Sequence, residues 1–244
     1  MKKSFLILSA LYIAAMAVAQ DVLVIPYNTT SLTEEQRNAN PDYIVYPASL
    51  EGVDEVDMIC NKYVDLGLPS GTKWAKCNVG ASTPEEYGDY FAWGETEPKD
   101  NYSWSTYKWC NGTEYTLTKY CAEDNKTVLE LEDDAATVNW GKEWRTPTGE
   151  EFYELFNNCT CIWTTMNGVN GCKLVGSNGN SIFLPAAGEY YDTTLYEEGT
   201  CCSYWLNTIS RFAYANYVTI RNEGWGWPGT HYCKGVSVRP VLNK

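Results

Sequence analysis

The chain has 244 residues with 31 acidic and 18 basic side chains, and its formal net charge is −13 at pH 7. This acidity argues against nucleic acid and anionic membranes as partners, because their phosphate groups would repel the protein. With a single histidine and no Cys-x-x-Cys pair, the sequence also offers no recognisable metal site, and we expect no cofactor.

Residues 1–19 have the pattern of a secretion signal. Lys2 and Lys3 precede an apolar run over residues 5–18, and Ala17-Val18-Ala19 resembles a signal-peptidase site. We therefore expect an exported protein, located at the cell surface, in the periplasm or outside the cell. Removing the two lysines leaves 16 basic and 31 acidic side chains, a net charge of −15. Because no later stretch approaches the roughly 18–20 apolar residues of a membrane span, we expect no transmembrane span.

Residues 20–59 are interpreted as an N-terminal extension. Segments 27–30 and 37–41 are loop-like, and apolar residues occur only in short patches. The extension is expected to lend a strand to the fold or to act as a flexible linker. Residues 60–244 contain no Pro-, Gly- or Ser-rich linker and are expected to form one domain.

The first elements of that domain are a strand, a tight turn and a second strand over residues 63–75, with the turn at Pro69-Ser70-Gly71. Thr83-Pro84-Glu85-Glu86 then has the pattern of a helix start, so a short helix is predicted before Gly88. Residues 90–94 are expected to form a buried strand or bend. A long loop with short elements is expected to follow, over residues 95–129.

The clearest helix prediction follows Trp144-Arg145-Thr146-Pro147. Thr148-Gly149-Glu150-Glu151 is a capping box, and four apolar residues then follow with helical spacing. These residues are Phe152, Leu155, Phe156 and Cys159. This amphipathic helix is expected to pack on a sheet.

Short strands are predicted after this helix. They cover residues 161–165, 171–175, 181–184, 214–220 and 236–241. Turns are predicted at Asn167-Gly168, Asn170-Gly171 and 177–180. The predicted fold class is α+β, with two short helices packed on a twisted antiparallel sheet and long loops.

Ten cysteines in an exported chain favour disulfide bonds, but their spacing shows no repeated framework. The pairs Cys159/Cys161 and Cys201/Cys202 are too close in sequence for simple mutual bridging. We therefore expect two or three disulfides at most, with some thiols free.

Carboxylate pairs and the histidine give little indication of catalysis. Glu85-Glu86 and Glu150-Glu151 are explained by helix starts, where acidic residues favour the helix dipole. Asp133-Asp134 and Glu197-Glu198 are interpreted as solvated faces. His231 has no surrounding motif and is interpreted as a contact residue. A non-catalytic protein is therefore predicted.

Aromatic residues are concentrated in residues 189–233, which hold 11 aromatics in 45 positions against 14% overall. Tyr and Trp provide large contact areas at low conformational cost, so this density is typical of a recognition surface. For any single ring, however, a place in the core of a β-rich domain is the better prediction.

Several motifs resemble the Fibrobacter succinogenes major paralogous domain. They are residues 64–71, 87–95, 144–148 with Glu151 and Leu155, 178–188, Tyr204-Trp205 and 237–241. The resemblance covers roughly residues 60–241. It implies a C-type-lectin-like fold, which this family shares with formylglycine-generating enzymes and with the variable proteins of diversity-generating retroelements.

The resemblance also implies that variable residues, where present, lie near the C-terminus on the ligand-facing side. Adenine-directed mutagenesis of asparagine codons cannot produce Lys, Gln or Met, and none of these occurs between Lys173 and Lys234. Where the family has Trp-Ser-Ser, this chain has Trp205-Leu206-Asn207, which fits either a variable site or ordinary drift. Cys201, Cys202 and Cys233 are interpreted as possible products of such variation.

We therefore predict an exported recognition protein, a monomer, that binds an unknown protein or glycan ligand at a cell surface. The predicted exposed contact residues are Tyr191, Asn207, Arg211, Tyr214, Arg221, Trp225, Trp227 and His231. Trp205, Trp144 and Arg239 are assigned to the scaffold. One alternative is a metal-independent carbohydrate-binding adhesin domain, since the Glu-Pro-Asn and Trp-Asn-Asp signatures of calcium-dependent lectins are missing. The other is an oxidase resembling formylglycine-generating enzymes.

Overall fold

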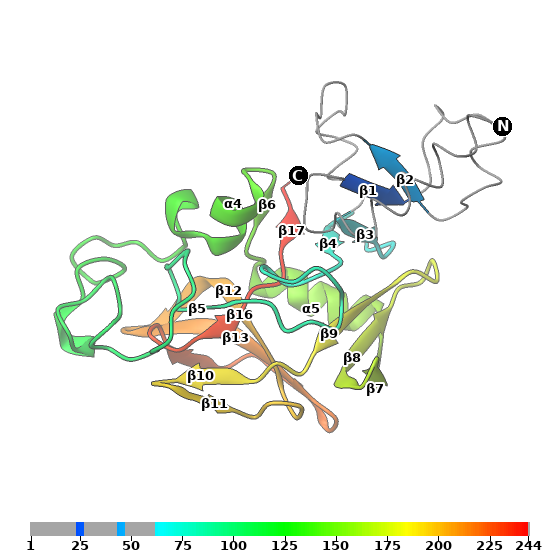
Figure 1. Ribbon diagram of the computed structural model, residues 1–244. Coiled ribbons are helices and arrows are strands. Elements are labelled where there is room, and N and C mark those ends of the chain that lie inside the picture. The colour runs from blue at the N-terminus through cyan, green and yellow to red at the C-terminus, as the bar shows by residue number, and fades with distance from the viewer. Residues whose placement is uncertain (1–22, 27–42, 47–61, 244) are drawn as a thin grey trace, which may run out of the picture. The chain divides into compact units, whose positions relative to one another are not determined.

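The computed structural model describes residues 23–26, 43–46 and 62–243, and it is mostly β-structure with two short α-helices (Figure 1). The chain divides into two units, residues 1–62 and 63–244. In the first unit, β1 (Leu23–Pro26) and β2 (Tyr43–Tyr46) pair with each other as antiparallel strands. The predicted signal peptide and the loop-like segments of the extension lie outside the described residues.

The largest sheet of the second unit has six strands. In chain order they are β5 (Tyr90–Phe91), β12 (Cys202–Arg211), β13 (Tyr214–Arg221), β14 (Gly224–Gly226), β15 (Gly229–His231) and β16 (Val236–Ser237). Their order across the sheet is β14-β13-β12-β16-β5, and β15 also pairs with β13. β12 and β13 form its central antiparallel hairpin, whereas β12 and β16 run parallel.

Three smaller sheets complete the described part of this unit. The four-stranded sheet contains β3 (Tyr63–Asp65), β4 (Lys73–Ala75), β17 (Val241–Leu242) and β6 (Trp144–Arg145). The three-stranded sheet contains β7 (Thr160–Met166), β8 (Val169–Val175) and β9 (Ser181–Pro185). β10 (Glu189–Tyr191) and β11 (Thr194–Tyr196) form a separate pair.

The predicted helix after Pro147 is confirmed as α5 (Gly149–Asn158), and its capping box is present. Thr148 Oγ1 accepts a hydrogen bond from Glu151 N at 3.2 Å, and Glu151 Oε2 accepts one from Thr148 N at 2.9 Å. Phe152 and Leu155 on its apolar face are fully buried. The helix therefore packs on the sheet as its amphipathic pattern indicates.

The predicted helix after Thr83 is wrong. Glu86 Oε2 does accept hydrogen bonds from Ser82 N and Thr83 N, at 2.6 and 3.2 Å, but the segment forms only a turn. Gly88 has φ +71°, and Asp89 N donates to Val79 O, so the chain turns back before a second helical turn can form. A capping pattern alone is therefore not sufficient to form a helix when the chain reverses direction within the next few residues.

The second helix, α4 (Ala135–Trp140), instead follows the short 3-10 helices η1 (Glu114–Thr116) and η2 (Leu131–Asp133). Asp134 caps it by accepting hydrogen bonds from Ala136 N and Thr137 N, and Thr146 also donates to Asp134. Asp133 accepts from Tyr120 Oη and pairs with Lys119. Both carboxylates are buried, so the interpretation of Asp133-Asp134 as a solvated face is wrong.

The six-stranded sheet is covered on both faces, and β12 contributes to two separate cores. Tyr204 and Leu206 pack in the core that contains Phe152 of α5. Trp205, between them, faces the opposite side and packs in the core that contains Trp93. Because successive strand residues point to opposite faces, burial on both sides leaves the inner part of β12 apolar without alternation.

Arg239 lies at the centre of the scaffold, as predicted, and is fully buried. Its guanidinium donates to Asn78 Oδ1 at 2.8 Å, to Ala75 O at 3.1 Å, to Phe183 O at 2.9 Å and to Lys76 O. These hydrogen bonds hold β4 and β9 to the C-terminal segment. Trp144 and Trp205 are likewise buried, so all three scaffold assignments have the expected burial.

Two turn and strand predictions need correction. Asn167-Gly168 does connect β7 and β8, with positive φ at both residues, but Asn170-Gly171 lies inside β8 and pairs with the neighbouring strands. The predicted strand 236–241 is split into β16 and β17, which belong to different sheets. The intervening Val238-Arg239-Pro240 positions the Arg239 side chain between them.

One disulfide, Cys161–Cys172, joins β7 and β8 across 6.2 Å between their Cα atoms. Seven other cysteines are free thiols, and Cys60 lies outside the described residues. Among the described cysteines there is thus one disulfide, which lies within the predicted maximum of two or three, and the predicted free thiols are present. Cys159 and Cys161 do not bridge each other, in agreement with their spacing.

Candidate ligand-binding site

The outer half of the β12–β13 hairpin differs in register from its inner half. At the inner end Cys202 lies opposite Ile220, and this register continues to Trp205. Register shifts then follow between Trp205 and Ile209 and between Ile209 and Arg211. Such bulges bend a strand and redirect its side chains, and they are frequent beside functional sites.

A loop segment borders β12 where these shifts occur. Leu129 N donates to Asn207 O at 2.8 Å, Ile209 N donates to Thr127 O at 3.0 Å, and Asn207 N donates to Pro147 O at 3.0 Å. These bonds use backbone groups that the irregular pairing leaves free. The outer half of the hairpin is thus supported by residues far away in sequence.

The hairpin closes through the two-residue turn Phe212-Ala213. Ala213 has φ +60°, a region that favours glycine, and its carbonyl accepts a hydrogen bond from Tyr232 N at 3.1 Å. Phe212 is 52% exposed at the tip. The turn therefore presents a large apolar ring to solvent on a backbone that is tied to the buried Tyr232.

Beside this turn, five side chains form a group that we name the hairpin-end cluster: Trp104, Glu114, Arg211, Tyr214 and His231. The guanidinium of Arg211 lies over the Tyr214 ring, 4.1 Å from its centroid. Tyr214 is hydrogen-bonded to His231 Nε2, and their rings meet edge to face with centroids 4.3 Å apart. Trp104 and Glu114 approach His231 from the loop, at 5.6 Å between ring centroids and 3.9 Å between Oε2 and Nε2.

Burial lowers the pKa of His231, while the Glu114 carboxylate raises it to a smaller extent. The imidazole is therefore neutral at pH 7, and Nε2 accepts the hydrogen bond when the Tyr214 hydroxyl donates. Lys234 and Arg211 also lower this pKa. The cluster combines a neutral imidazole, a guanidinium, a carboxylate and two aromatic rings.

Tyr115, in the neighbouring 3-10 helix η1, is 80% exposed and was not among the predicted contact residues. Its exposure follows from a loop closed by the bridge between Cys110 and Leu117. No local sequence pattern marks it. Tyr191, at the end of β10, is 37% exposed, and Lys234 Nζ lies 5.9 Å from its ring centroid.

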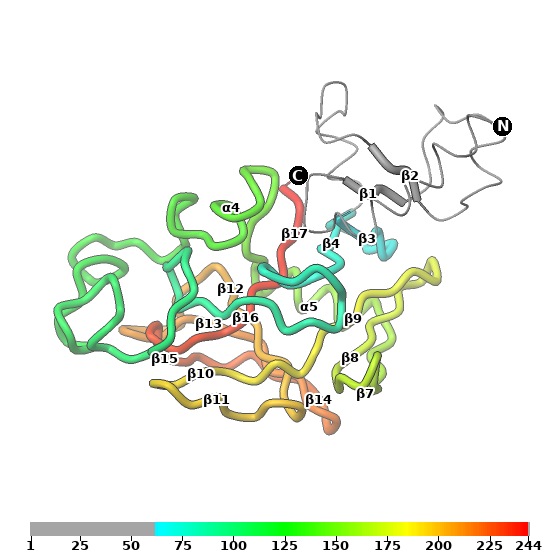
Figure 2. Tube along the Cα trace, in the orientation of Figure 1, coloured from blue at the N-terminus to red at the C-terminus, as the bar shows by residue number. Residues whose placement is uncertain are grey.

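Trp225 and Trp227 lie elsewhere, beside α5. The Trp225 ring stacks on Phe156 with centroids 4.4 Å apart and planes at 12°, and the Trp227 ring lies against Gly149. β14 and β15 follow one another along β13 (Figure 2), with Thr219 opposite Gly226 and Tyr214 opposite His231. β14 and β15 pair with β13 in the same register, so together they form one edge of the sheet. This edge extends from α5 to the hairpin-end cluster and is interrupted at Pro228.

The remaining predicted contact residues have other surroundings. Arg221 forms an ion pair with Glu197, with its Nη2 2.8 and 2.6 Å from the two carboxylate oxygens. Asn207 is half-buried, and its Oδ1 atom is buried without a hydrogen-bond partner. The structure therefore brings together Arg211, Tyr214 and His231, whereas Asn207, Arg221, Trp225 and Trp227 have other surroundings.

Cys201, Cys202 and Cys233 are fully buried. Burial raises the pKa of all three thiols, for Cys233 to about 12. A buried thiol with a raised pKa is a poor nucleophile at neutral pH. These cysteines are therefore core residues rather than members of a contact surface.

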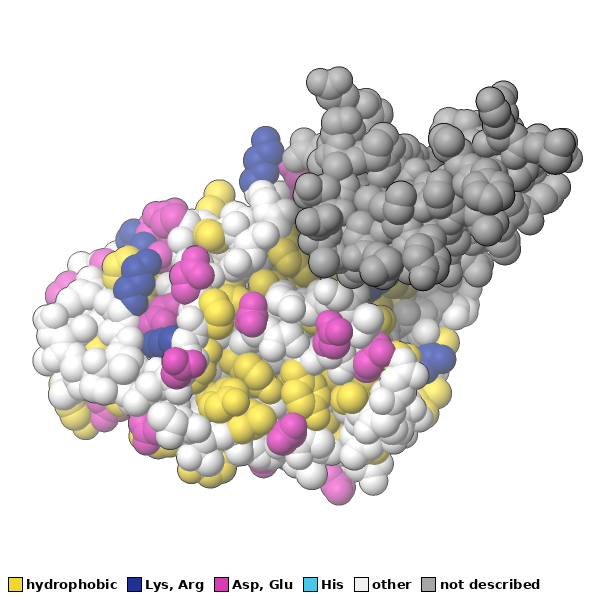
Figure 3. All heavy atoms as spheres, viewed as in Figure 1, with side chains coloured by type: hydrophobic (Ala, Val, Ile, Leu, Met, Phe, Trp, Pro, Cys, Tyr) yellow, Lys and Arg dark blue, Asp and Glu magenta, His cyan; other side chains and the backbone are white. Residues whose placement is uncertain are grey.

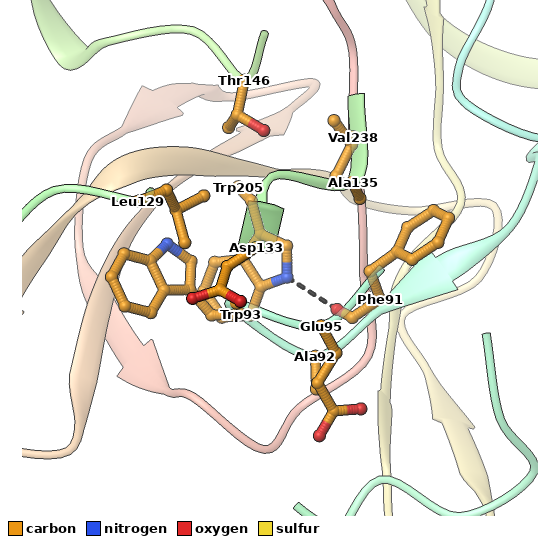
Figure 4. Close-up of a pocket in the computed structure, with 11 residues that line it drawn as sticks. Phe91, Ala92, Trp93, Glu95, Leu129, Asp133, Ala135, Thr146, Trp205 and Val238 are labelled. Atoms are coloured by element: carbon orange, nitrogen blue, oxygen red, sulfur yellow. Dashed lines mark hydrogen bonds between the residues drawn. The ribbon is translucent and has the colours of Figure 1, made fainter. Parts of the chain in front are cut away.

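Behind the hairpin there is little space. A cavity of about 10 Å³ lies between Trp205, Trp93, Asp133 and neighbouring residues, and Trp205 Nε1 donates to Phe91 O at 2.7 Å beside it (Figure 4). That volume holds roughly one water molecule. The inner end of the hairpin is thus packed, and contact with a ligand falls to its outer end.

Within residues 62–243 and the two described strands of the first unit, no three His, Cys, Asp or Glu side chains come together as a metal site. In the same part of the chain, no helix is long and apolar enough to cross a membrane. Comparison with protein-family models, curated proteins and solved structures found no match.

Proposed function

We propose that the protein is an exported, non-catalytic recognition protein that binds a protein or glycan partner through the hairpin-end cluster. The main observation in support of this proposal is that the exposure of aromatic side chains differs between the two ends of one hairpin. Trp205 is 1% exposed at the inner end, whereas Phe212 is 52% exposed at the tip. Large exposed rings on a rigid support are the usual anchors of a binding surface.

The cluster is also chemically prepared for contact. One face of the Arg211 guanidinium rests on Tyr214, and Arg211 makes no ion pair among the described residues. Its N–H groups remain available to a carboxylate or to sugar hydroxyls of a partner. Because the stacking restricts the side chain before binding, less conformational entropy is lost on contact.

In this proposal the fold is C-type-lectin-like, and residues 189–233 form a variable face diversified by a retroelement. The buried Arg239 and Trp205 support a constant frame, and the exposed tip offers positions where substitution leaves the core intact. The buried cysteines do not fit variation of a contact surface. The proposal therefore concerns positions at the hairpin end such as the exposed Arg211 and Phe212 and the half-buried Tyr214.

Neighbouring DNA provides the test of diversification. A reverse-transcriptase gene and a near-copy of the codons for residues 189–233, differing only at adenines, are expected beside the gene. Their absence would leave the binding proposal in place and remove the retroelement from it.

Binding itself is tested with a glycan array and a random displayed-peptide library as probes. A variant with Arg211→Ala, Phe212→Ala, Tyr214→Ala and His231→Ala is expected to lose at least tenfold in affinity for every selected glycan or peptide. Its thermal midpoint should stay within a few degrees of the parent, because the four side chains are exposed or half-buried and belong to neither core.

The matched control is Tyr153→Ala with Ile162→Ala, two exposed apolar residues outside the cluster. This control should keep full binding. If the control loses binding and the cluster variant keeps it, the contact surface lies elsewhere. If the cluster variant unfolds, its rings belong to the core and the proposal fails.

A metal-independent carbohydrate-binding adhesin is the second candidate, and Trp225 is the observation that favours it. Phe156 covers one face of the Trp225 indole, yet the residue is 38% exposed. A fixed, flat ring of this kind can stack against the C–H face of a sugar. Loss of neutral-glycan binding in Trp225→Ala, with the cluster variant unaffected, would favour this site over the hairpin end.

An oxidase of the formylglycine-generating type receives no support from the thiols, because burial disfavours the thiolate form of Cys201, Cys202 and Cys233. We propose that the protein is not an enzyme. Copper uptake together with turnover of a cysteine-containing peptide would contradict this.

A further inference from the structure

A second concave site lies outside the hairpin-end cluster. It is a hollow of about 310 Å³ between the segment leading into β5, residues 98–102 and the β10–β11 turn. Its lining residues are Gly88, Asp89, Tyr90, Pro98, Lys99, Asp100, Tyr102, Tyr190 and Thr193. On the face drawn in Figure 3, hydrophobic side chains gather between the segment before β5 and β10, with acidic side chains spaced around them.

Three tyrosine rings pack together at this hollow. The Tyr190 ring meets Tyr90 edge to face at 4.8 Å between centroids and stacks on Tyr102 at 5.5 Å. The Tyr90 hydroxyl donates to Ala187 O, and the Tyr102 hydroxyl donates to Tyr90 O, both at 2.6 Å. Tyr102 is 2% exposed and supports the other two rings from behind, whereas Tyr90 and Tyr190 are half-buried and contribute mainly ring surface to the hollow.

Two acidic residues, Asp89 and Asp100, line the hollow together with the tyrosines. Neither forms an ion pair or a side-chain hydrogen bond among the described residues. The neighbouring Lys99 does not neutralise them, because its ammonium is bound to Glu95 at 2.8 Å and to Thr106 O at 3.0 Å. The hollow therefore carries uncompensated negative charge beside aromatic rings.

This combination selects a cation. Aromatic faces carry negative partial charge and attract ammonium groups, and carboxylates add a full charge. The chain itself provides an example, since Lys99 Nζ lies 5.6 Å from the centroid of Tyr102. A small metal ion fits less well, because Ca²⁺ requires about six to eight oxygen ligands.

We propose that this hollow binds an organic ammonium group, either from a small amine or from a lysine side chain of a partner. Its volume lies at the lower end of the range for ligand sites, about 300–1,000 Å³, which suits a group of this size. The site does not depend on the hairpin-end cluster, since of its nine lining residues only Tyr190 and Thr193 belong to the segment 189–233.

Choline and its neutral isostere 3,3-dimethylbutan-1-ol are the probes for the test, because they share a shape and differ in charge. Titration of the full-length mature protein, followed by amide NMR, should shift the signals of Gly88 and Thr193 with choline. The neutral isostere is expected to bind roughly tenfold more weakly. Equal affinity of the two probes would overturn the proposal, and so would a Ca²⁺ response without a choline response.

Two further experiments identify the source of the ammonium group and the residues that bind it. Nα-acetyl-lysine methylamide binding more tightly than choline assigns the site to a lysine side chain, and the reverse assigns it to a small amine. Asp89→Asn with Asp100→Asn should weaken choline at least tenfold with an unchanged amide spectrum elsewhere. The control Glu97→Gln with Glu123→Gln removes the same charge from exposed acids outside the hollow and should bind as the parent does. Parent-like binding by the aspartate variant would contradict the proposal.

Discussion

The inner and outer ends of the β12–β13 hairpin are built from the same two strands, yet their environments are opposite. At the inner end Tyr204 and Trp205 enter two cores on opposite faces of the sheet. At the outer end Arg211 and Tyr214 stack at the surface, and Phe212 is 52% exposed. Between them the register shifts and the Thr127–Leu129 segment replaces regular strand pairing.

This difference shows that aromatic content alone does not define a binding surface. Both ends belong to the aromatic-rich segment 189–233. They differ in whether other parts of the protein pack against the two faces of the sheet. α5 covers one face of the inner end, and the core containing Trp93 covers the other. The core that contains Trp93 continues to Ile209 and Ala215. Beyond this pair Arg211 and Phe212 are exposed and Tyr214 is half-buried, so residues of this segment become available for contact.

The largest effect that the comparison predicts is on stability at the inner end. Trp205→Ala removes a 1% exposed indole and its hydrogen bond to Phe91 O, and should cost about 3–5 kcal/mol. Tyr214→Ala, its counterpart at the outer end, should cost less than about 1 kcal/mol. Urea unfolding of both variants measures the difference. Similar losses in the two variants would mean that the outer end is also core.

A smaller effect is expected where the edge strand passes the start of α5. A Cβ at Gly149 would lie 1.6 Å from two ring carbons of Trp227, so Gly149→Ala must displace that indole. Trp227 is 39% exposed and can swing into solvent, so the net change in unfolding free energy should stay within about 1 kcal/mol. The Trp227 indole N–H signal in NMR reports the displacement.

The control for this prediction is the same substitution in a Trp227→Ala background. There the methyl group meets no ring, and the higher helix propensity of Ala should stabilise the protein by up to about 1 kcal/mol. Additive effects of the two substitutions would show that Trp227 does not pack against the first residue of α5. The strands that pack against α5 would then not include the segment around Trp227.

Elements with a local pattern could be predicted from the sequence. α5 has a capping box and an apolar stripe, and the β7–β8 hairpin has Asn167-Gly168 at its turn. β12 was missed, although it is one of the central strands, because its inner half is buried on both faces and shows no alternation. The α4 helix was missed because its cap, Asp134, is completed by Thr146, twelve residues away.

The site could be predicted only in part, for the same reason. Arg211, Tyr214 and His231 follow from ring density and the family resemblance, but their grouping depends on the pairing of β13 with β15. Trp104, Glu114 and Tyr115 come from a loop without periodicity. The hollow beside Tyr90, Tyr102 and Tyr190 is lined by three segments that are distant in sequence, so no local sequence pattern predicts it.

The smallest expected effect is a pH dependence confined to the outer end. Burial lowers the pKa of His231 below its unfolded value of about 6.5, so the folded state favours the neutral ring. The resulting stabilisation is present above pH 6.5 and is lost as the pH falls through the lowered pKa. Because His231 is the single histidine, its Hε1 resonance reports the titration directly. Glu114→Gln should lower this pKa further, since Glu114 opposes the effect of burial. A resonance that titrates at or above pH 6.5 would mean that Glu114 outweighs burial, in contrast to the neutral His231 imidazole inferred from the structure.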